Sequence, residues 1–124
     1  MIKTNKKRLL IADDFEFNRL LIKKILDKSP YNYSLVTNGQ EAVQKFSSEP
    51  FDLVILDIEM PVMDGIDALK KMKEINNHIP VMALTGHSEE ARLDVLKQLG
   101  FSAIIKKPFQ QGDFIRAIKQ EFKK

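Results

Sequence analysis

Four short apolar runs in this chain each lead to a reactive polar side chain, and no other feature of the sequence constrains the fold as strongly. The runs are Leu9–Ala12 before Asp13 and Asp14, Leu53–Leu56 before Asp57, Val81–Leu84 before Thr85, and Ala103–Ile105 before Lys106 and Lys107. Continuous apolar runs of this length are typical of buried strands in a parallel sheet. Parallel strands end at one edge of the sheet, where open α/β folds bind ligands. We therefore expect three acids, a hydroxyl and an amine to meet in one crevice.

The segments between these runs carry apolar residues at helical spacing, so strands and helices should alternate. Strands are expected over Arg8–Ala12, Tyr31–Thr37, Asp52–Leu56, Val81–Leu84 and Ser102–Lys106. The connections are short, and right-handed crossovers with helices on both faces leave few topologies. The sequence predicts an α/β domain of the flavodoxin-like (βα)5 type, with three layers and a parallel five-stranded sheet in the order 2-1-3-4-5.

Capping residues and helix breakers suggest where the helices begin and end. The first helix is expected over about Phe15–Lys28. Its buried face should carry Phe17, Leu21 and Ile25, which are spaced four residues apart. Asp64 and Ser88 are expected to cap the third and fourth helices, and Gly100 to end the fourth.

Length and composition narrow the class of protein. The chain of 124 residues suits one hydrophobic core, and we expect a single domain over residues 1–124. It has no cysteine, which excludes disulfides and thiolate metal sites. No apolar stretch approaches the roughly 20 residues of a membrane span, so we expect a cytoplasmic protein with no membrane partner.

The net charge of +3 comes from the two ends of the chain. Between Leu9 and Ile118 the sequence has 13 basic and 16 acidic residues. A nucleic-acid-binding domain concentrates basic residues on one face or helix, so we expect no direct binding to nucleic acid.

The predicted crevice has the residue types that phosphoryl transfer needs. Three converging carboxylates repel one another unless a cation joins them, and an all-oxygen set suits Mg²⁺. A carboxylate such as that of Asp57 can also attack phosphorus and form an acyl phosphate. Lys107 supplies a positive charge for phosphoryl oxygens, and the Thr85 hydroxyl supplies a hydrogen-bond donor.

Five motifs, in order along the chain, carry a resemblance to a known family. They are Asp13-Asp14, Asp57 with Met60-Pro61, Asp64-Gly65, Thr85-Gly86 and Lys107-Pro108-Phe109. In these residues, and over essentially its whole length, the chain resembles the receiver domain of two-component response regulators. The segment Asp14–Arg19 is also similar to receivers attached to hybrid histidine kinases.

The resemblance implies that Asp57 accepts a phosphoryl group from a phosphohistidine on a sensor histidine kinase or a histidine-phosphotransfer protein. It implies that Thr85 and Lys107 hold this group, and that the domain signals by a conformational change. It further implies a cis peptide bond between Lys107 and Pro108. The sequence departs from many receivers at Ile104, where an aromatic residue is common.

The resemblance also implies a magnesium site. Asp14, Asp57 and the backbone carbonyl of Glu59 would bind Mg²⁺ directly, and Asp13 would act through a water molecule. His87, two residues after Thr85, remains open as a further contact of the site.

Two other functions stay open at this point. An aspartyl-nucleophile phosphatase commonly has a second acid two residues after its nucleophile, which is the position of Glu59 relative to Asp57. A degenerate receiver would act only as a docking module. On the main interpretation the chain is not an enzyme: it promotes only its own phosphorylation and dephosphorylation, as a monomer or a weak dimer.

Overall fold

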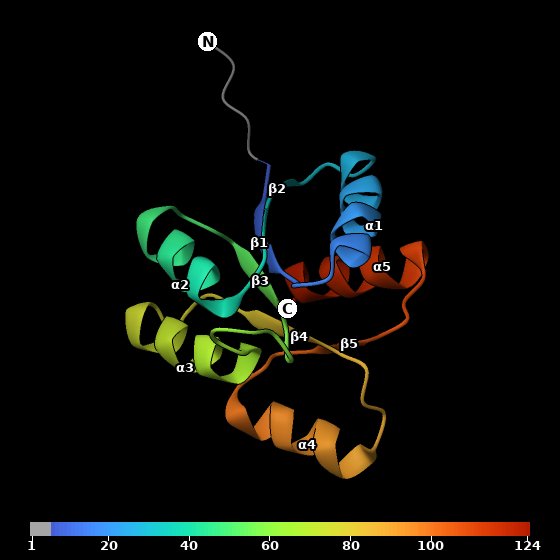
Figure 1. Cartoon of the computed structure of the whole chain (residues 1–124). Coiled ribbons are helices and arrows are strands. Elements are labelled where there is room, and N and C mark those ends of the chain that lie inside the picture. Colours follow the sequence, from blue (N-terminus) through green and yellow to red (C-terminus); the bar gives the residue numbers. More distant parts are fainter. Residues whose placement is uncertain (1–5) are drawn as a thin grey trace.

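A computed structural model describes residues 6–124 of the chain (Figure 1). Within this part, five strands alternate with five helices. The strands are β1 (Arg8–Ala12), β2 (Asn32–Val36), β3 (Leu53–Asp57), β4 (Val81–Thr85) and β5 (Ile104–Lys106). The helices are α1 (Glu16–Asp27), α2 (Gly39–Ser48), α3 (Gly65–Ile75), α4 (Glu90–Leu99) and α5 (Gln111–Phe122). The predicted alternation is confirmed, although β5 is two residues shorter at its start than expected.

The strands form one parallel sheet in the order β2-β1-β3-β4-β5, as predicted. Ala12 on β1 pairs with Leu56 on β3, so the acids that follow in the two strands are neighbours. Further along the same edge, Thr85 on β4 pairs with Lys106 on β5. The register of the sheet therefore delivers the predicted site residues to one edge.

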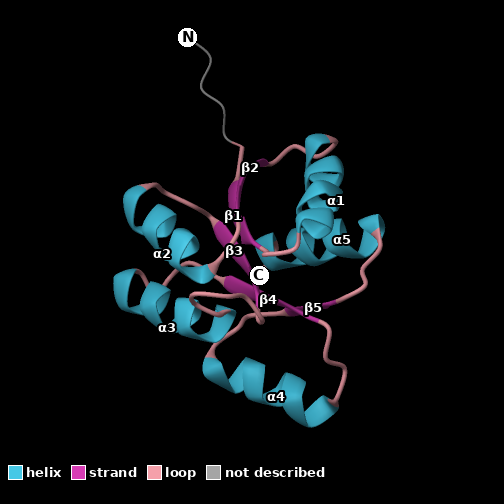
Figure 2. Cartoon of the chain, viewed as in Figure 1, coloured by secondary structure: helices cyan, strands magenta, loops and turns pink. Residues whose placement is uncertain are grey.

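Side chains alternate between the two faces of the sheet, and each face packs against its own layer of helices. Leu10, Val54 and Ala83 lie in a buried cluster with residues of α2, α3 and α4. Leu9, Leu53 and Met82 lie in a second cluster with residues of α1 and α5. Figure 2 shows the resulting three layers, with the strands between the two groups of helices. Because the central strands are covered on both faces, their sequences are apolar without interruption.

Two local predictions are wrong. Phe17 is 65% exposed, and the buried residues of α1 are Ile22, Ile25 and Leu26. A row of positions four apart drifts by about 40° per step around a helix, so a residue eight positions before Ile25 lies off the buried face.

Ser88 does not cap α4. The cap residue is Glu89, which keeps an extended backbone and makes no side-chain capping bond. The backbone N–H of His87 donates to Thr85 Oγ1 at 3.1 Å, which ties this loop to the end of β4, and the helix begins only after it. The other two predictions hold: Asp64 accepts a hydrogen bond from the N–H of Asp67, and Gly100 ends α4 with a φ of 118°.

Among residues 6–124, no helix is long and apolar enough to cross a membrane.

Candidate functional site

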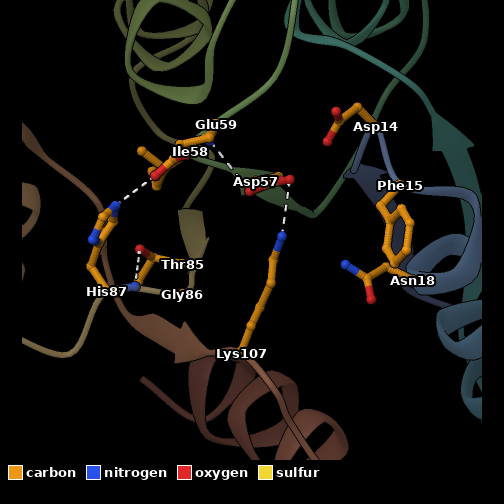
Figure 3. Close-up of a pocket in the computed structure, with 10 residues that line it drawn as sticks. All are labelled: Asp14, Phe15, Asn18, Asp57, Ile58, Glu59, Thr85, Gly86, His87 and Lys107. Atoms are coloured by element: carbon orange, nitrogen blue, oxygen red, sulfur yellow. Dashed lines mark hydrogen bonds and ion pairs between the residues drawn. The ribbon is translucent and has the colours of Figure 1, made fainter.

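A crevice of about 450 Å³ lies at the carboxyl ends of β1, β3, β4 and β5 (Figure 3). The residues that line it are Asp14, Phe15, Asn18, Asp57, Ile58, Glu59, Thr85, Gly86, His87 and Lys107. Asp13 contacts Lys107, one of these lining residues. The structure thus brings together all the residues that the sequence nominated for the site.

The three acids form a tight cluster of differing exposure. Asp13, Asp14 and Asp57 can each place one carboxylate oxygen within 4.8 Å of the others. Asp13 is fully buried and Asp57 is 4% exposed, whereas Asp14 is exposed to solvent. The Asp14 side chain lines the crevice. An exposed carboxylate beside two buried ones leaves an open side from which a cation can bind.

Lys107 is the counter-charge of the cluster. Its Nζ lies 3.0 Å from Asp57 Oδ2 and 3.4 Å from Asp13 Oδ2. Burial lowers the pKa of the Lys107 amine, but the hydrogen bonds and charges of Asp57 and Asp13 outweigh burial and raise it above its usual value. The amine is therefore charged and shared between two carboxylates.

Asp57 has a strongly raised pKa. Burial raises the pKa of Asp57 to about 6, and the charge of Asp13 adds to the rise, whereas Lys107 opposes it. Its Oδ1 accepts a 3.3 Å hydrogen bond from the backbone N–H of Glu59, and Oδ2 faces Lys107. A carboxylate held this way can act as a nucleophile once its negative charge is balanced.

The amino-terminal end of α1 holds Asp13 in place. The backbone N–H of Phe15 donates to Asp13 Oδ1 at 2.9 Å, and Asn18 Nδ2 donates to Oδ2 at 3.2 Å. Arg19 donates to the main-chain carbonyl of Asp13 at 2.9 Å. A buried carboxylate needs such partners, because an unpaired charge is costly to bury. Sequence reasoning did not identify the role of Asn18, which depends on how the first turn of α1 lies over β1.

The opposite wall of the crevice is formed by Thr85, Glu59 and His87. Thr85 is buried at the end of β4, and its carbonyl accepts a 2.7 Å hydrogen bond from the N–H of Lys107. His87 Nε2 lies 2.5 Å from Glu59 Oε1, so the question left open for His87 is answered: it lines the site. Figure 3 shows this pair on the side of Asp57 opposite Asp14 and Asn18.

The loop after β5 agrees with two expectations. The peptide bond between Lys107 and Pro108 is cis. Of the two adjacent lysines, Lys107 lines the crevice, whereas Lys106 is exposed. Ile104 is partly buried and packs against the cluster under α2, α3 and α4.

The donor set of the cluster fits Mg²⁺. All three side chains supply oxygen, and Mg²⁺ binds through one or two carboxylates while keeping several waters. Neither nitrogen nor sulfur ligands are needed for such a site, and a thiolate is excluded because the chain has no cysteine.

Comparison with known proteins agrees with this geometry. The chain matches the family model of the response regulator receiver domain over residues 9–119. It belongs to the response regulator receiver family. Receivers are phosphoacceptor signalling domains; they bind Mg²⁺ at an acidic pocket and interact with histidine kinases or phosphotransfer proteins.

Known receivers resemble this one over most of its length. The chemotaxis protein CheY of Thermotoga maritima is 35% identical over 115 residues, which are 92% of this chain and 96% of CheY. The autoinducer 1 sensor kinase/phosphatase LuxN of Vibrio campbellii is 37% identical over 98 residues, or 79% of this chain. This receiver spans only 12% of the length of LuxN. The same kind of domain therefore occurs both as nearly the whole of a small protein and as a part of a large one.

The receiver domain of the sensor histidine kinase PA1611 from Pseudomonas aeruginosa has the same architecture, with a TM-score of 0.84. It is 25% identical in sequence, and the match covers 93% of this receiver and 96% of that one. A magnesium ion is coordinated in the active-site cleft of that structure.

Proposed function

We propose that Asp57 is the phosphoacceptor of this receiver and that its phosphoryl group comes from a phosphohistidine on a partner protein. The observation that carries the proposal is the 3.0 Å contact between Lys107 Nζ and Asp57 Oδ2 at the open edge of the sheet. An amine this close to the acceptor carboxylate is also within reach of the oxygens of a phosphoryl group attached to it.

In the transfer step, a carboxylate oxygen of Asp57 attacks phosphorus while the P–N bond of the phosphohistidine breaks. The electron pair of that bond stays on the imidazole nitrogen, which takes up a proton. Lys107 and the hydroxyl of Thr85 then hold oxygens of the new acyl phosphate. Thr85 lines the same crevice as Asp57, which supports this role.

We assign the magnesium ligands to Asp14, Asp57 and the backbone carbonyl of Glu59, with Asp13 acting through a water molecule. Both carboxylate oxygens of Asp13 already accept hydrogen bonds, whereas the Asp14 carboxylate is open to solvent. A Mg²⁺ ion held by these ligands would neutralise negative charge in the site.

The partner in this proposal is a sensor histidine kinase or a histidine-phosphotransfer protein. Residues 1–124 would act as a single receiver domain, as a monomer or a weak dimer. The domain would change conformation when Asp57 is phosphorylated, and it would not bind nucleic acid directly. Such a domain promotes only its own phosphorylation and dephosphorylation. A cytoplasmic location also belongs to the proposal.

Neither alternative is favoured. A phosphatase would use Glu59 as a second acid beside Asp57, but the Glu59 carboxylate is bonded to His87 instead. A degenerate docking module would not need a charged lysine against a buried aspartate, and the ion pair between Lys107 and Asp57 is present.

Mass spectrometry of the intact protein tests the proposal. Incubation with Mg²⁺ and acetyl phosphate should add one phosphoryl group to the wild type and none to Asp57→Asn. Asp94→Asn, which removes an exposed acid on α4, should be labelled like the wild type. Equal labelling of the wild type and Asp57→Asn, or no labelling of the wild type with Mg²⁺ present, would contradict it.

A further inference from the structure

Asn18 lies beside the proposed acceptor site without being one of its reacting groups. It is half-buried in α1 and lines the crevice, with its amide directed toward the acids (Figure 3). Its Nδ2 donates a 3.2 Å hydrogen bond to Asp13 Oδ2. Within residues 6–124, the Asp13 carboxylate contacts two side-chain donors: this amide and the amine of Lys107.

The two donors share one oxygen. Lys107 Nζ lies 3.4 Å from the same Oδ2 of Asp13, but 3.0 Å from Oδ2 of Asp57. The lysine is thus closer to the phosphoacceptor than to Asp13. Asn18 satisfies part of the hydrogen-bonding capacity of Asp13 that the lysine would otherwise have to fill.

Removing the amide would disturb this division. Asp13 is fully buried, and a buried carboxylate that loses a hydrogen bond is costly unless another donor replaces the lost one. The nearest remaining donor should therefore move toward it. That donor is Lys107, whose flexible stem allows the amine to move. Movement toward Asp13 takes the charge away from Asp57.

We infer that Asn18 is a positioning residue for phosphorylation: by holding Asp13 Oδ2, its amide keeps the amine of Lys107 on Asp57. The inference rests on the proposed function of Asp57. It connects α1 to the acceptor through the series Asn18, Asp13, Lys107 and Asp57, each in contact with the next.

The residue type fits the task. An amide donates a hydrogen bond without adding charge, whereas an acid at position 18 would place a fourth carboxylate beside three that already repel one another. Arg19, next in α1, holds the main-chain carbonyl of Asp13, so the backbone of the aspartate has an anchor independent of Asn18. Loss of the amide should therefore act on the carboxylate without releasing the main chain.

The test compares Asn18→Leu, which keeps a similar shape but has no donor, with Asn18→Gln, which keeps the amide. At saturating Mg²⁺ and acetyl phosphate, the phosphorylation rate of Asn18→Leu should fall about fivefold or more. A change of this size is within the free energy that a hydrogen bond to a charged group contributes. Asn18→Gln should keep about half of the wild-type rate or more, because it retains the donor. Gln40→Leu, the same kind of change at an exposed position of α2, should have no effect on this rate.

Two further measurements separate positioning from a merely structural role. The Mg²⁺ dissociation constant of Asn18→Leu, measured by calorimetry, should stay within about twofold of the wild-type value, because the substitution removes none of the proposed ligands. In a crystal structure of Asn18→Leu, Lys107 Nζ should lie closer to Asp13 Oδ2 than to Asp57 Oδ2.

The positioning role is refuted if the rate is unchanged in Asn18→Leu, if the Mg²⁺ dissociation constant of Asn18→Leu rises well beyond twofold, or if Asn18→Gln is as slow as Asn18→Leu. A wild type that takes up no phosphoryl group would instead refute the assignment of Asp57. The two failures are therefore distinguishable in one set of assays.

Discussion

Replacing Asp57 with asparagine should stabilise the metal-free protein, because the wild type holds a buried carboxylate beside two other acids. Burial and the charge of Asp13 raise the pKa of Asp57 from 3.8 to about 6 even with Lys107 in contact. A shift of roughly two pKa units corresponds to about 3 kcal/mol against the charged form in the folded state. Because the crevice opens to solvent, which screens these charges, we expect a gain of about 1–2 kcal/mol in the free energy of unfolding.

The pH dependence follows from the direction of the shift. The folded protein holds the proton of Asp57 up to about pH 6, whereas the unfolded chain releases it near 3.8. Stability of the metal-free wild type should therefore fall as the pH rises through this interval, and the penalty is complete above it. Asparagine does not titrate, so the advantage of Asp57→Asn should be largest at neutral pH and should narrow as the pH is lowered toward 4.

Urea denaturation in EDTA, at several pH values between about 4 and 8, measures the difference directly. Asp94→Asn is the control for a change in net charge, and it should unfold like the wild type. Addition of Mg²⁺ should stabilise the wild type and close the gap, since an ion that binds only the folded state raises its stability. The reasoning is wrong if Asp57→Asn is no more stable than the wild type in EDTA at neutral pH, or if the difference does not depend on pH.

Three further predictions concern Mg²⁺ binding and the segment from β3 to the start of α3. Asp14→Ala should weaken Mg²⁺ binding more than Glu59→Ala, because the alanine at position 59 keeps the backbone carbonyl. Calorimetric titration of both variants with Mg²⁺ measures the difference, and a larger loss in Glu59→Ala would contradict the assignment. Val62, 76% exposed, has a φ of 69°, which strains a β-branched residue, so Val62→Asn should raise the free energy of unfolding by about 1 kcal/mol in urea. A Cβ on Gly65 would lie 2.3 Å from the carbonyl oxygen of Asp57, so Gly65→Ala should cost about 2 kcal/mol and also weaken Mg²⁺ binding; an unchanged urea midpoint would refute the clash.

The sheet could be predicted because its central strands are unbroken apolar runs in the sequence. Leu53 to Leu56 are buried on both faces, and such a strand shows as an unbroken apolar run in any sequence. β2 is different, since its residues from Tyr33 to Val36 are only partly buried at the edge of the sheet. Its sequence therefore gives a weaker strand signal than the unbroken apolar runs of the central strands.

The surface of α1 could not be predicted from spacing alone. Phe15, Phe17 and Leu20 are large, apolar and exposed, with the rings of Phe15 and Phe17 6.2 Å apart. Apolar residues at helical spacing normally indicate the face that packs on the core. Here the helix carries apolar side chains on both its buried and its exposed face, so periodicity could not separate the two.

The site residues divide by what positions them. Asp13, Asp57 and Lys107 stand at or just beyond strand ends, so the register of the sheet brings them together, and the sequence identifies them through the strands that they follow. Asn18 and His87 stand on a helix and a loop, and their contacts depend on how those segments cross the strand ends. His87 meets Glu59 across 28 positions of sequence, a contact that no local pattern encodes. Substitutions in these outer residues can therefore change how the acids and the lysine are held while the sheet and its register stay the same.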